Sequence, residues 1–420
     1  MREMKDSGVA WIGEIPKDWD LSRLKFSSTY NDESIKEDTN PEKEIEYVEI
    51  GSVTLENGVE KAEVMRFKDA PSRARRIARK GDIIISTVRT YLKAIALIEK
   101  ESYTVSTGFC VIRPQKCMDS GYLKYFCSSE LFTSEVSACS VGISYPAINA
   151  STLMDFHIIN PPLAVQHKIV RVLDEKCNHV DSLIANVQAQ IEKLKAYKQS
   201  LITEVVTKGL DLNAPMKDSG VDWIGTIPEN WNVVKTGRLF RENNRCPIGN
   251  DVPLSLSQAD GLVATADMKE SSLETSSYDN WKRVEIGDLV LNRFKAHLGV
   301  LFAAKLTGIV SFHYGVYEAQ CRLVPKFYEY LYHSNQYKAI LGNASNGMVV
   351  GLQNLSNLSF YTTYSLYPPY AEQEKIADYL DAKCSQIDQL ISLKESKIEK
   401  LQQYKRSLIY EYVTGKKEVV

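Results

Sequence analysis

The sequence predicts an α+β protein in which two similar modules stand in tandem, separated by two long antiparallel helices with pseudo-two-fold symmetry. Two repeats support this prediction. MKDSGVAWIGEIPKDW at 4–19 returns as MKDSGVDWIGTIPENW at 216–231, with twelve of sixteen positions identical. IEKLKAYKQSLITEVVT at 191–207 returns as IEKLQQYKRSLIYEYVT at 398–414. The chain of 420 residues is also too long for one hydrophobic core, which favours at least two domains.

Each module is predicted to end in a long helix. Apolar residues recur at intervals of four and three over about five heptads, as in a coiled-coil seam. A double proline begins each stretch, at 161–162 and 368–369, and proline is tolerated in the first turn of a helix. A short loop follows the first helix, so the simplest cover for each apolar stripe is the other helix running antiparallel. The alternative is that each helix packs on its own module. The predicted helix-pair contacts are Ile169, Leu173, Val180, Ile184, Ile191, Leu194, Leu201, Ile376, Leu380, Ile387, Ile391, Ile398, Leu401 and Leu408.

The interiors of the two modules share little sequence and are predicted to combine short strands with a few helices. One shared feature is Gly81-Asp82, which returns as Gly287-Asp288 before another apolar run. Helices are expected at 121–132 and 327–337. Strand-like runs lie at 44–50, 81–86, 103–114, 156–162, 288–294 and 360–369. The resulting domain boundaries are 1–160 and 211–367 for the modules, with helices at 161–210 and 368–420.

Composition points to a protein of the reducing cytoplasm. The eight cysteines form no CxxC pair and do not cluster with the six histidines, so we expect free thiols rather than a zinc site. The N-terminus lacks the apolar segment of a signal peptide, and no window is apolar enough for a membrane span. The net charge of −2 gives no global basic field, although a local patch would suffice to bind nucleic acid.

The sequence offers little evidence for catalysis. It contains no GxGxxG after a strand, no P-loop and no GxSxG turn. Asn160-Pro-Pro-Leu resembles the Asn/Asp-Pro-Pro-aromatic loop of DNA amino-methyltransferases, but its fourth residue is not aromatic. The second copy has the aromatic residue, in Tyr367-Pro-Pro-Tyr, but lacks the asparagine. Prolines that begin a helix explain both strings better than a catalytic loop does. We therefore expect no catalytic residue and no metal ligand in this chain.

Local clusters of positive charge are the strongest functional indication. Seven basic residues and one acid lie between positions 71 and 95, and a second basic cluster flanks the corresponding strand of the second module. Arginine and lysine can hold phosphates, and arginine can also read a guanine edge. A solvated basic face would explain either cluster alone, but two clusters at matching places favour DNA binding. The candidates are Arg73, Arg75, Arg76, Arg79, Arg89, Tyr91 and Lys93, and Lys282, Arg283, Arg293, Lys295 and His297.

Two further loops are candidates for contact with bases. The segments at 140–149 and 344–354 each follow a predicted helix and carry glycine and small polar residues. Ser144 and Tyr145 are the candidates in the first loop, and the Ser345-Asn346 pair is the candidate in the second. An ordinary connecting loop is the alternative interpretation of both.

The doubled order of these segments resembles the DNA-specificity subunit of type I restriction–modification systems. Each copy has W-I-G-x-I-P-x-x-W, a Gly-Asp strand, a strand running into Pro-Pro, then Gln-x-x-Ile and a helix ending in Tyr-Lys-x-Ser-Leu-Ile. Each piece is weakly specific, but the repeated order is highly specific and covers nearly the whole chain. In the two copies the glutamines are Gln166 and Gln373, and the helix-end strings are 197–202 and 404–409.

The resemblance implies a non-catalytic chain with two target recognition domains, each reading one half of a bipartite double-stranded DNA target. It further implies that the helices set the half-site spacing and dock two modification (methyltransferase) subunits, which restriction (motor and nuclease) subunits join. S-adenosylmethionine, ATP and Mg²⁺ would bind to those partners. Two rival hypotheses are a self-sufficient methyltransferase or nuclease, which cofactor binding would reveal, and a tandem adaptor that does not bind DNA.

Overall fold

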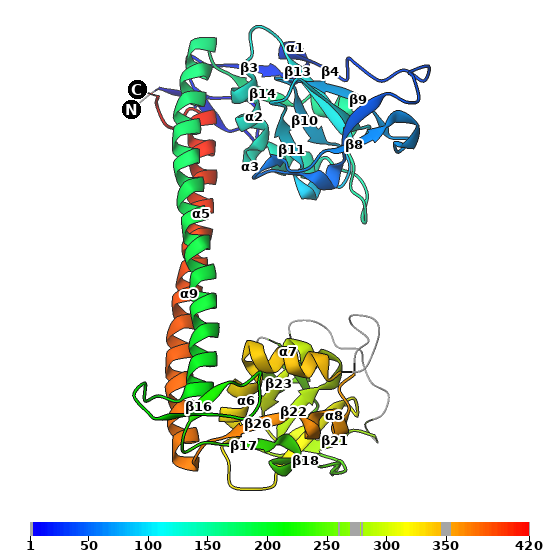
Figure 1. The fold of residues 1–420 in the computed structure, drawn as a ribbon. Coiled ribbons are helices and arrows are strands. Elements are labelled where there is room, and N and C mark those ends of the chain that lie inside the picture. The colour runs from blue at the N-terminus through cyan, green and yellow to red at the C-terminus, as the bar shows by residue number, and fades with distance from the viewer. Residues whose placement is uncertain (1–2, 259–260, 269–277, 279, 346–353, 420) are drawn as a thin grey trace. The chain divides into compact units, whose positions relative to one another are not determined.

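The computed structural model describes residues 3–258, 261–268, 278, 280–345 and 354–419. They divide into two compact units, one of Met1–Val187 with Ser396–Val420 and one of Gln188–Glu395. Each unit contains one α+β domain and parts of both long helices, α5 (Leu163–Lys208) and α9 (Tyr370–Val413), as Figure 1 shows. The predicted α+β class and the two long helices are confirmed.

The domain of the first unit is built on two four-stranded sheets. One has the order β11-β10-β13-β4 and is antiparallel throughout, and the other has the order β8-β5-β12-β9, in which β5 and β12 are parallel. Two-stranded pairs β1-β2, β6-β7 and β14-β3 complete it. The strands are β1 Met4–Asp6, β2 Glu14–Pro16, β3 Asp20–Arg23, β4 Ser28–Tyr30, β5 Glu44–Val48, β6 Val53–Thr54, β7 Gly58–Val59, β8 Glu63–Arg66, β9 Ala74–Arg79, β10 Ile83–Ser86, β11 Ile95–Leu97, β12 Ser102–Ser106, β13 Phe109–Pro114 and β14 His157–Asn160. The short helices are α1 Leu24–Ser27, α2 Ser120–Ser128, α3 Glu130–Ala138 and α4 Ala150–Met154.

The second unit repeats the first sheet, with the order β18-β25-β22-β23. Its other described strands form the pairs β15-β16, β17-β26, β19-β20 and β21-β24. The strands are β15 Met216–Asp218, β16 Thr226–Pro228, β17 Asn232–Lys235, β18 Phe240–Glu242, β19 Leu254–Ser257, β20 Gly261–Ala264, β21 Lys282–Val284, β22 Leu289–Asn292, β23 Leu301–Ala303, β24 Gly308–Val310, β25 Tyr314–Ala319 and β26 Tyr364–Tyr367. The short helices are α6 Pro325–His333, α7 Asn335–Asn343 and α8 Asn357–Thr362.

The strand after each Gly-Asp pair lies between two apolar cores. In β10, Ile83 and Ile85 enter one core while Ile84 enters the other, because successive side chains of a strand point to opposite faces. In β22, Leu289 and Val290 divide between two cores in the same way. Burial on both faces explains why these strands read as continuous apolar runs.

The long helices pack antiparallel within each unit. In the first unit Lys405 donates to Asp181 (Nζ to both carboxylate oxygens, 2.7 Å), and in the second Lys198 donates to Asp388 at the same distance. The two pairs are the same contact with the roles of the helices exchanged. Of the predicted helix-pair residues, nine are buried; Ile184, Leu194, Ile391, Ile398 and Leu401 are partly buried.

The apolar stripe of each long helix is covered both by the other long helix and by a domain, so both predicted alternatives occur together. In the first unit, Leu173 of α5 and Leu408 of α9 belong to one core with Trp19 and the domain's α2 and α3. In the second unit, Leu201 and Leu380 share a core with Trp231 in the same manner. The helical ends are therefore integral parts of the two domain cores.

The repeated N-terminal segment lies against the end of a long helix in both units. A Cβ at Gly415, just after α9, would lie 2.8 Å from Trp19, and one at Gly209, just after α5, would lie 3.4 Å from Trp231. Both glycines have positive φ, so they end the helices and permit close approach of the tryptophans. This shared packing explains why 4–19 and 216–231 are so similar.

A buried glutamine fixes each long helix to its domain. Gln166 accepts from the backbone N–H of Asp119 and donates to the carbonyl of Pro161, both at 2.8 Å. Gln373 makes the same two kinds of bond, with Val324 and Pro368. Gln166 also donates to the side chain of Asn160 (3.1 Å), so the asparagine of the Asn-Pro-Pro-Leu string has a structural partner.

Most predicted elements of the module interiors are present, with three differences. The run 360–369 begins in helix α8, and only Tyr364–Tyr367 of it form a strand, because residues 357–362 are helical. The run 103–114 forms two strands, β12 and β13, which belong to different sheets and meet at Gly108, where a Cβ would lie 2.6 Å from Ile50. Each predicted short helix is two helices broken at a serine, Ser129 or Ser334. The eight cysteines are free thiols, and no helix in the described part of the chain is long and apolar enough to cross a membrane. Nor do the described residues contain a cluster of three or more potential metal ligands.

Candidate nucleic-acid interface

The aspartate of each Gly-Asp pair is structural. Asp82 accepts from the backbone N–H of Arg79 and, through both oxygens, from Arg113. Asp288 accepts from the backbone N–H of Glu285 and from Arg245 at 2.6 Å, and burial raises the pKa of Asp288. The aspartate thus holds the turn that starts the central strand, which explains its presence in both copies.

A strained loop follows the central strand of the first unit. A single 3₁₀ turn, η3 (Thr90–Leu92), is flanked by Arg89 (φ 51°) and Lys93 (φ 49°), both in the left-handed region. Among the described residues other than glycine, only Asn31 also has positive φ. Such conformations are unfavourable for L-residues and concentrate at functional sites. Tyr91 and Leu92 are exposed on this loop.

A hairpin over 139–148 is attached to this loop by backbone and side-chain bonds. Val141 and Ala147 exchange two backbone hydrogen bonds, and Ile148 donates to the carbonyl of Thr87 (2.9 Å). The hydroxyls of Thr90 and Ser140 are 2.8 Å apart. The two loops therefore form one structure, which we call the reading head (residues 87–93 and 139–148).

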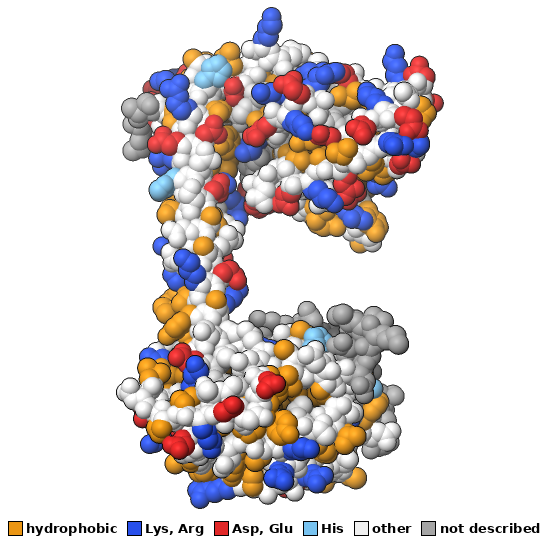
Figure 2. Space-filling view, viewed as in Figure 1, with side chains coloured by type: hydrophobic (Ala, Val, Ile, Leu, Met, Phe, Trp, Pro, Cys, Tyr) orange, Lys and Arg blue, Asp and Glu red, His pale blue; other side chains and the backbone are white. Residues whose placement is uncertain are grey.

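The tip of the reading head exposes apolar and cationic groups together. Val141, Ile143 and Tyr145 are 81%, 102% and 64% exposed. Cζ of Arg89 lies 4.8 Å from the centre of the Tyr145 ring, a cation–π contact that holds the guanidinium at the surface. The hairpin extends beyond the body of its unit in Figure 1, and Figure 2 shows apolar and basic side chains beside one another there.

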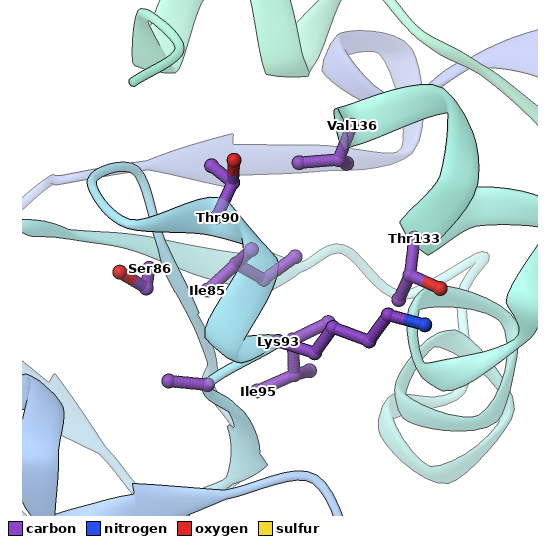
Figure 3. A pocket seen from close by; sticks show the side chains of 8 residues that line it. Ile85, Ser86, Thr90, Lys93, Ile95, Thr133 and Val136 are labelled. Carbon is purple, nitrogen blue, oxygen red and sulfur yellow. The ribbon is translucent and has the colours of Figure 1, made fainter. Parts of the chain in front are cut away.

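Lys93 lies on the inner side of the reading head. It lines a small cavity with Thr90 of η3, Ile85 of β10 and Thr133 and Val136 of α3. Figure 3 shows its side chain extending toward Thr133, so the aliphatic stem is covered by α3. Lys93 is half-buried, whereas Arg89 is exposed.

The four arginines of 73–79 have different environments. Arg79 forms a bidentate pair with Glu33, which together with Arg113 lowers the pKa of Glu33 to about 2. Arg75 stacks on Phe67 (4.9 Å), and burial lowers the pKa of Arg76. Arg73 is exposed. The pairing with Glu33 neutralises the charge of Arg79 at the surface of the domain.

Three of the candidate cations in the second unit are held by acids. Lys282 and Arg293 both donate to the mostly buried Glu242, at 2.6 and 2.5 Å. Arg283 contacts Asp251 (3.2 Å) and Glu285 (3.0 Å). Although burial tends to raise the pKa of Glu242, its hydrogen bonds to Lys282 and Asn357 outweigh that effect and lower it. These contacts indicate a structural role for Lys282, Arg283 and Arg293.

Strand register shows which residues of the second unit correspond to the reading head. Ile83 pairs with Ile112 as Leu289 pairs with Tyr317, and Ile85 pairs with Ile95 as Leu291 pairs with Leu301. Residue counting from these strands matches Thr87 with Arg293, Arg89 with Lys295, Tyr91 with His297 and Lys93 with Gly299. Gly299 also has positive φ, so this turn ends in the same conformation in both units.

The loop of the second unit presents different chemistry. It forms η6 (Arg293–Leu298), in which Lys295 is exposed and Nδ1 of His297 is buried without a hydrogen-bond partner among the described atoms. Phe294 and Phe312 are both exposed and each contacts His313, with ring centres 5.5 and 3.9 Å apart. Exposed aromatic rings can stack on bases. Sequence reasoning missed these rings, although Phe294 lies between two basic candidates.

The second candidate loop of this unit is only partly described. Ser345 donates to the carbonyl of Leu341 at the end of α7, and Asn346 lies outside the described residues. After the undescribed residues, the backbone N–H of Leu355 donates to the carbonyl of Arg293 at 3.1 Å. The end of this loop thus contacts η6, much as the hairpin of the first unit contacts η3.

Fold and surface together define a class of protein: a tandem scaffold on paired helices that carries an exposed, partly cationic loop surface on each unit. Residues 16–193 match the family model described as the type I restriction modification DNA specificity domain. Beyond this matched domain, the chain as a whole is similar to type I restriction enzyme specificity subunits.

Relatives in sequence and structure agree with this assignment. The putative type I restriction enzyme MjaX specificity subunit of Methanocaldococcus jannaschii is 24% identical over 96% of this chain and 95% of its own. The MjaVIII specificity subunit of the same organism is 25% identical over 76% of this chain and 75% of its own.

Solved structures share the fold. A chain from a structure of type I restriction–modification complex assembly and conformational transition superposes with a TM-score of 0.73 at 21% identity, covering 95% of this chain and 98% of that one. The HsdS subunit of Thermoanaerobacter tengcongensis gives a TM-score of 0.53 at 22% identity, covering 96% and 98%.

Proposed function

We propose that this chain reads a bipartite double-stranded DNA sequence for a type I restriction–modification complex, one half-site per unit. The observation that carries the proposal is the reading head, in which a strained loop with Arg89 is bonded to an exposed hairpin with Tyr145. Specificity requires side chains that reach base edges, and arginine with apolar groups can read guanine and the thymine methyl in the major groove.

The second half-site would be read by Lys295 and the exposed aromatic rings around His313. Register places Lys295 where the first unit has Arg89, and both side chains are exposed. The surrounding residues differ between the units, so the two half-sites should differ in sequence. Arg73 is a candidate phosphate contact because it is exposed, whereas Arg79, Lys282, Arg283 and Arg293 are held by acids.

The long helices would set the spacing between half-sites and dock two modification subunits, which restriction subunits would join. The similarity of the chain to type I restriction enzyme specificity subunits supports this assignment. In the proposal this chain supplies no catalytic group, because the structural bond of Asn160 accounts for the one string that resembled a methyltransferase loop. S-adenosylmethionine, ATP and Mg²⁺ would bind to the partner subunits.

The test is selection of duplexes from a random DNA pool by the complex of this chain with its modification subunit. A two-part sequence with a fixed gap is the expected result. Replacement of Arg89 by alanine should relax one base pair in one half only. Recovery of DNA without sequence enrichment would contradict the proposal and favour a tandem adaptor.

A further inference from the structure

Three exposed cations lie on the second unit away from its loop η6. Lys235 ends β17, Arg238 belongs to the 3₁₀ turn η4 (Thr236–Arg238), and Arg241 lies in the edge strand β18. None of the three forms an ion pair with an acid among the residues that the structure describes. Figure 2 shows lysine and arginine side chains together at the lower end of this unit, where Figure 1 places β17 and β18. We call Lys235, Arg238 and Arg241 the distal cations.

A tyrosine, not an acid, connects the elements that carry the distal cations. Cζ of Arg241 lies 5.4 Å from the centre of the Tyr361 ring. The hydroxyl of Tyr361 accepts from the backbone N–H of Glu242 at 2.8 Å, which fixes the ring beside β18. A Cβ at Gly237 would lie 2.8 Å from Cβ of Tyr361, so the same tyrosine also packs closely on η4. The cation–π contact holds the guanidinium at the surface without neutralising its charge.

The acids beside β18 have other partners. Glu318 is the register partner of Arg241, but it accepts from the side-chain amide of Asn243 (2.7 Å) and lies 3.4 Å from Arg245. Glu242, the next residue of β18, is held by the two cations described above. The positive charge of the distal cations therefore remains available to an anionic partner.

The matching positions of the first unit are chemically different. The offset of 212 residues between the N-terminal repeats matches Lys235 with Arg23, Arg238 with Phe26 and Arg241 with Thr29. Arg23 shares the carboxylate of Asp155 with Lys25, at 3.6 and 2.6 Å. The offset of 207 residues between the later repeats places Thr362 where the first unit has Asp155. The first unit thus has one cation at these three places, and an acid holds it, whereas the second unit has three.

The distal cations lie along the sheet from the loop to which we assign base reading. The loop η6 follows Asn292, which pairs with Tyr314 of β25, whereas Arg241 pairs with Glu318, four residues further along β25. At about 3.4 Å per residue, this separation is about 14 Å. B-DNA also rises about 3.4 Å per base pair. A duplex that runs along this sheet would therefore pass the distal cations about four base pairs from the bases at η6.

We propose that the distal cations bind the phosphate backbone of the target duplex about four base pairs from the bases that the second unit reads. The inference rests on the proposed function, which supplies the duplex, and it adds a backbone contact that the first unit does not repeat. Lysine and arginine hold phosphates whatever the neighbouring base, and such contacts fix the register and orientation of a reader on the duplex. The contact supplies positive charge that Lys282, Arg283 and Arg293 do not, because acids hold those three.

The first experiment measures the salt dependence of duplex binding by the full-length chain in complex with its modification subunit. Replacement of all three distal cations by alanine should reduce the slope of the logarithm of the binding constant against the logarithm of the salt concentration. The expected reduction is about 2.7, since each phosphate contact contributes about 0.9. The affinity should fall by the same factor for the selected duplex and for a duplex of scrambled sequence, because phosphates carry no sequence information.

Two control variants separate a phosphate contact from other effects. Arg23→Ala with Lys25→Ala is the matched change in the first unit, and the slope should change by less than about 0.9 because these cations share Asp155. Arg238→Lys with Arg241→Lys keeps both charges and should keep the slope. Arginines that read base edges would instead lose their bidentate geometry in that variant, and sequence preference would change.

A second measurement locates the contact on the DNA. Uncharged methylphosphonate linkages are placed at successive positions of the selected duplex, and the second half-site is identified as the one that Lys295→Ala relaxes. Linkages about four base pairs to one side of that half-site should weaken binding of the unmodified complex by about tenfold at 0.1 M salt. The same linkages should not weaken binding of the triple alanine variant further. An equal loss in both complexes would overturn the proposal.

Failure of this inference is distinguishable from failure of the proposed function. If the triple variant keeps its slope and affinity while a two-part sequence is still selected, only the distal contact is wrong. If no two-part sequence is selected, the proposed function fails, and the salt titration on a random duplex still decides whether these cations bind DNA. A triple variant that loses partner subunits but keeps its salt dependence would assign the surface to an acidic protein and overturn the inference.

Discussion

The loop after the central strand is cationic in both units, yet its charges are used differently. In the first unit Arg89 is exposed and stacks on Tyr145, and its backbone is in the left-handed region. In the second unit Arg293 contacts the mostly buried Glu242, and the exposed cation is Lys295. Register matches Arg293 with Thr87 and Glu242 with Tyr30, so the buried pair has no counterpart in the first unit.

The difference shows that a basic residue beside the repeated Gly-Asp turn does not by itself leave a free positive charge at the surface. A nearby acid decides whether the charge of the cation remains available, as Glu33 does for Arg79 and Glu242 does for Arg293. In the first unit, hydrogen bonds to the hairpin hold the loop, whereas in the second unit Arg293 adds an ion pair with Glu242 and a hydrogen bond to Asn357 to the backbone bond from Leu355. The following predictions test this contrast.

The largest expected effect is on stability. Arg293→Ala removes one of the two cationic partners of Glu242 and, because Lys282 and Asn357 still bond Glu242, should lower the unfolding free energy of the second unit by about 2 kcal/mol. Lys295→Ala, at an exposed position, should change it by less than about 0.5 kcal/mol. Denaturant titration followed by hydrogen exchange of β22 peptides would measure both. Equal effects of the two variants on the unfolding free energy would contradict the different roles assigned to Arg293 and Lys295.

The next effect is on DNA recognition. Arg89→Ala and Lys295→Ala should each cost about 1–3 kcal/mol in discrimination at one base pair, in different half-sites. Arg79→Ala is the matched control, because its charge is already neutralised by Glu33, so sequence preference should not change. Binding of the complex to single-base variants of the selected DNA would measure the discrimination. A change of preference caused by Arg79→Ala would show that the ion-paired arginines also read DNA.

The third effect is a pH dependence that separates the units. The folded pKa of Glu33, about 2, lies below its ordinary value of 4.5. The ionised carboxylate therefore stabilises the folded first unit above pH 4.5, and this stabilisation is lost as pH falls toward 2. Glu33→Gln should remove this acid-dependent loss from the first unit while leaving the second unit's response, which depends on Glu242. Acid titration monitored by hydrogen exchange would measure it. Persistence of the full acid response in the variant would assign it to another group.

The smallest effect concerns backbone strain and has opposite signs in the two units. Arg89→Gly relieves a left-handed residue and should raise the unfolding free energy of the first unit by about 0.5–1 kcal/mol. Lys295 has φ −115°, which is not a left-handed conformation, so Lys295→Gly relieves no backbone strain. It should lower the unfolding free energy of the second unit by about 0.5–1 kcal/mol, because glycine loses more conformational freedom on folding. Thermal unfolding of the two variants would measure the difference. The same sign in both would show that the Arg89 backbone is not strained.

Much of the fold was predictable because it depends on local patterns. The four-three spacing of apolar residues predicted both long helices, and the continuous apolar runs after Gly81-Asp82 and Gly287-Asp288 predicted β10 and β22. The division of 103–114 into two sheets was not predictable in this way. It depends on the pairing of β12 with β5 and β9 and of β13 with β10 and β4, and most of these partners are distant in sequence.

The candidate interface was only partly predictable for the same reason. Arg89, Tyr91 and Tyr145 were found from residue type and position, but their assembly into one reading head depends on bonds such as that between Thr90 and Ser140. Aromatic rings around His313 were missed because Phe294 and Phe312 come together only in the folded chain.

By itself, the sequence determined the duplication, the long helices, the central strands and the places where basic residues gather. Those properties follow from periodicity and composition within short windows. Only the tertiary structure decided which cations remain available, because the acids that neutralise Arg79 and Arg293 lie 46 and 51 residues away in sequence. Electrostatic pairing depends on distance in space, and strand register sets that distance.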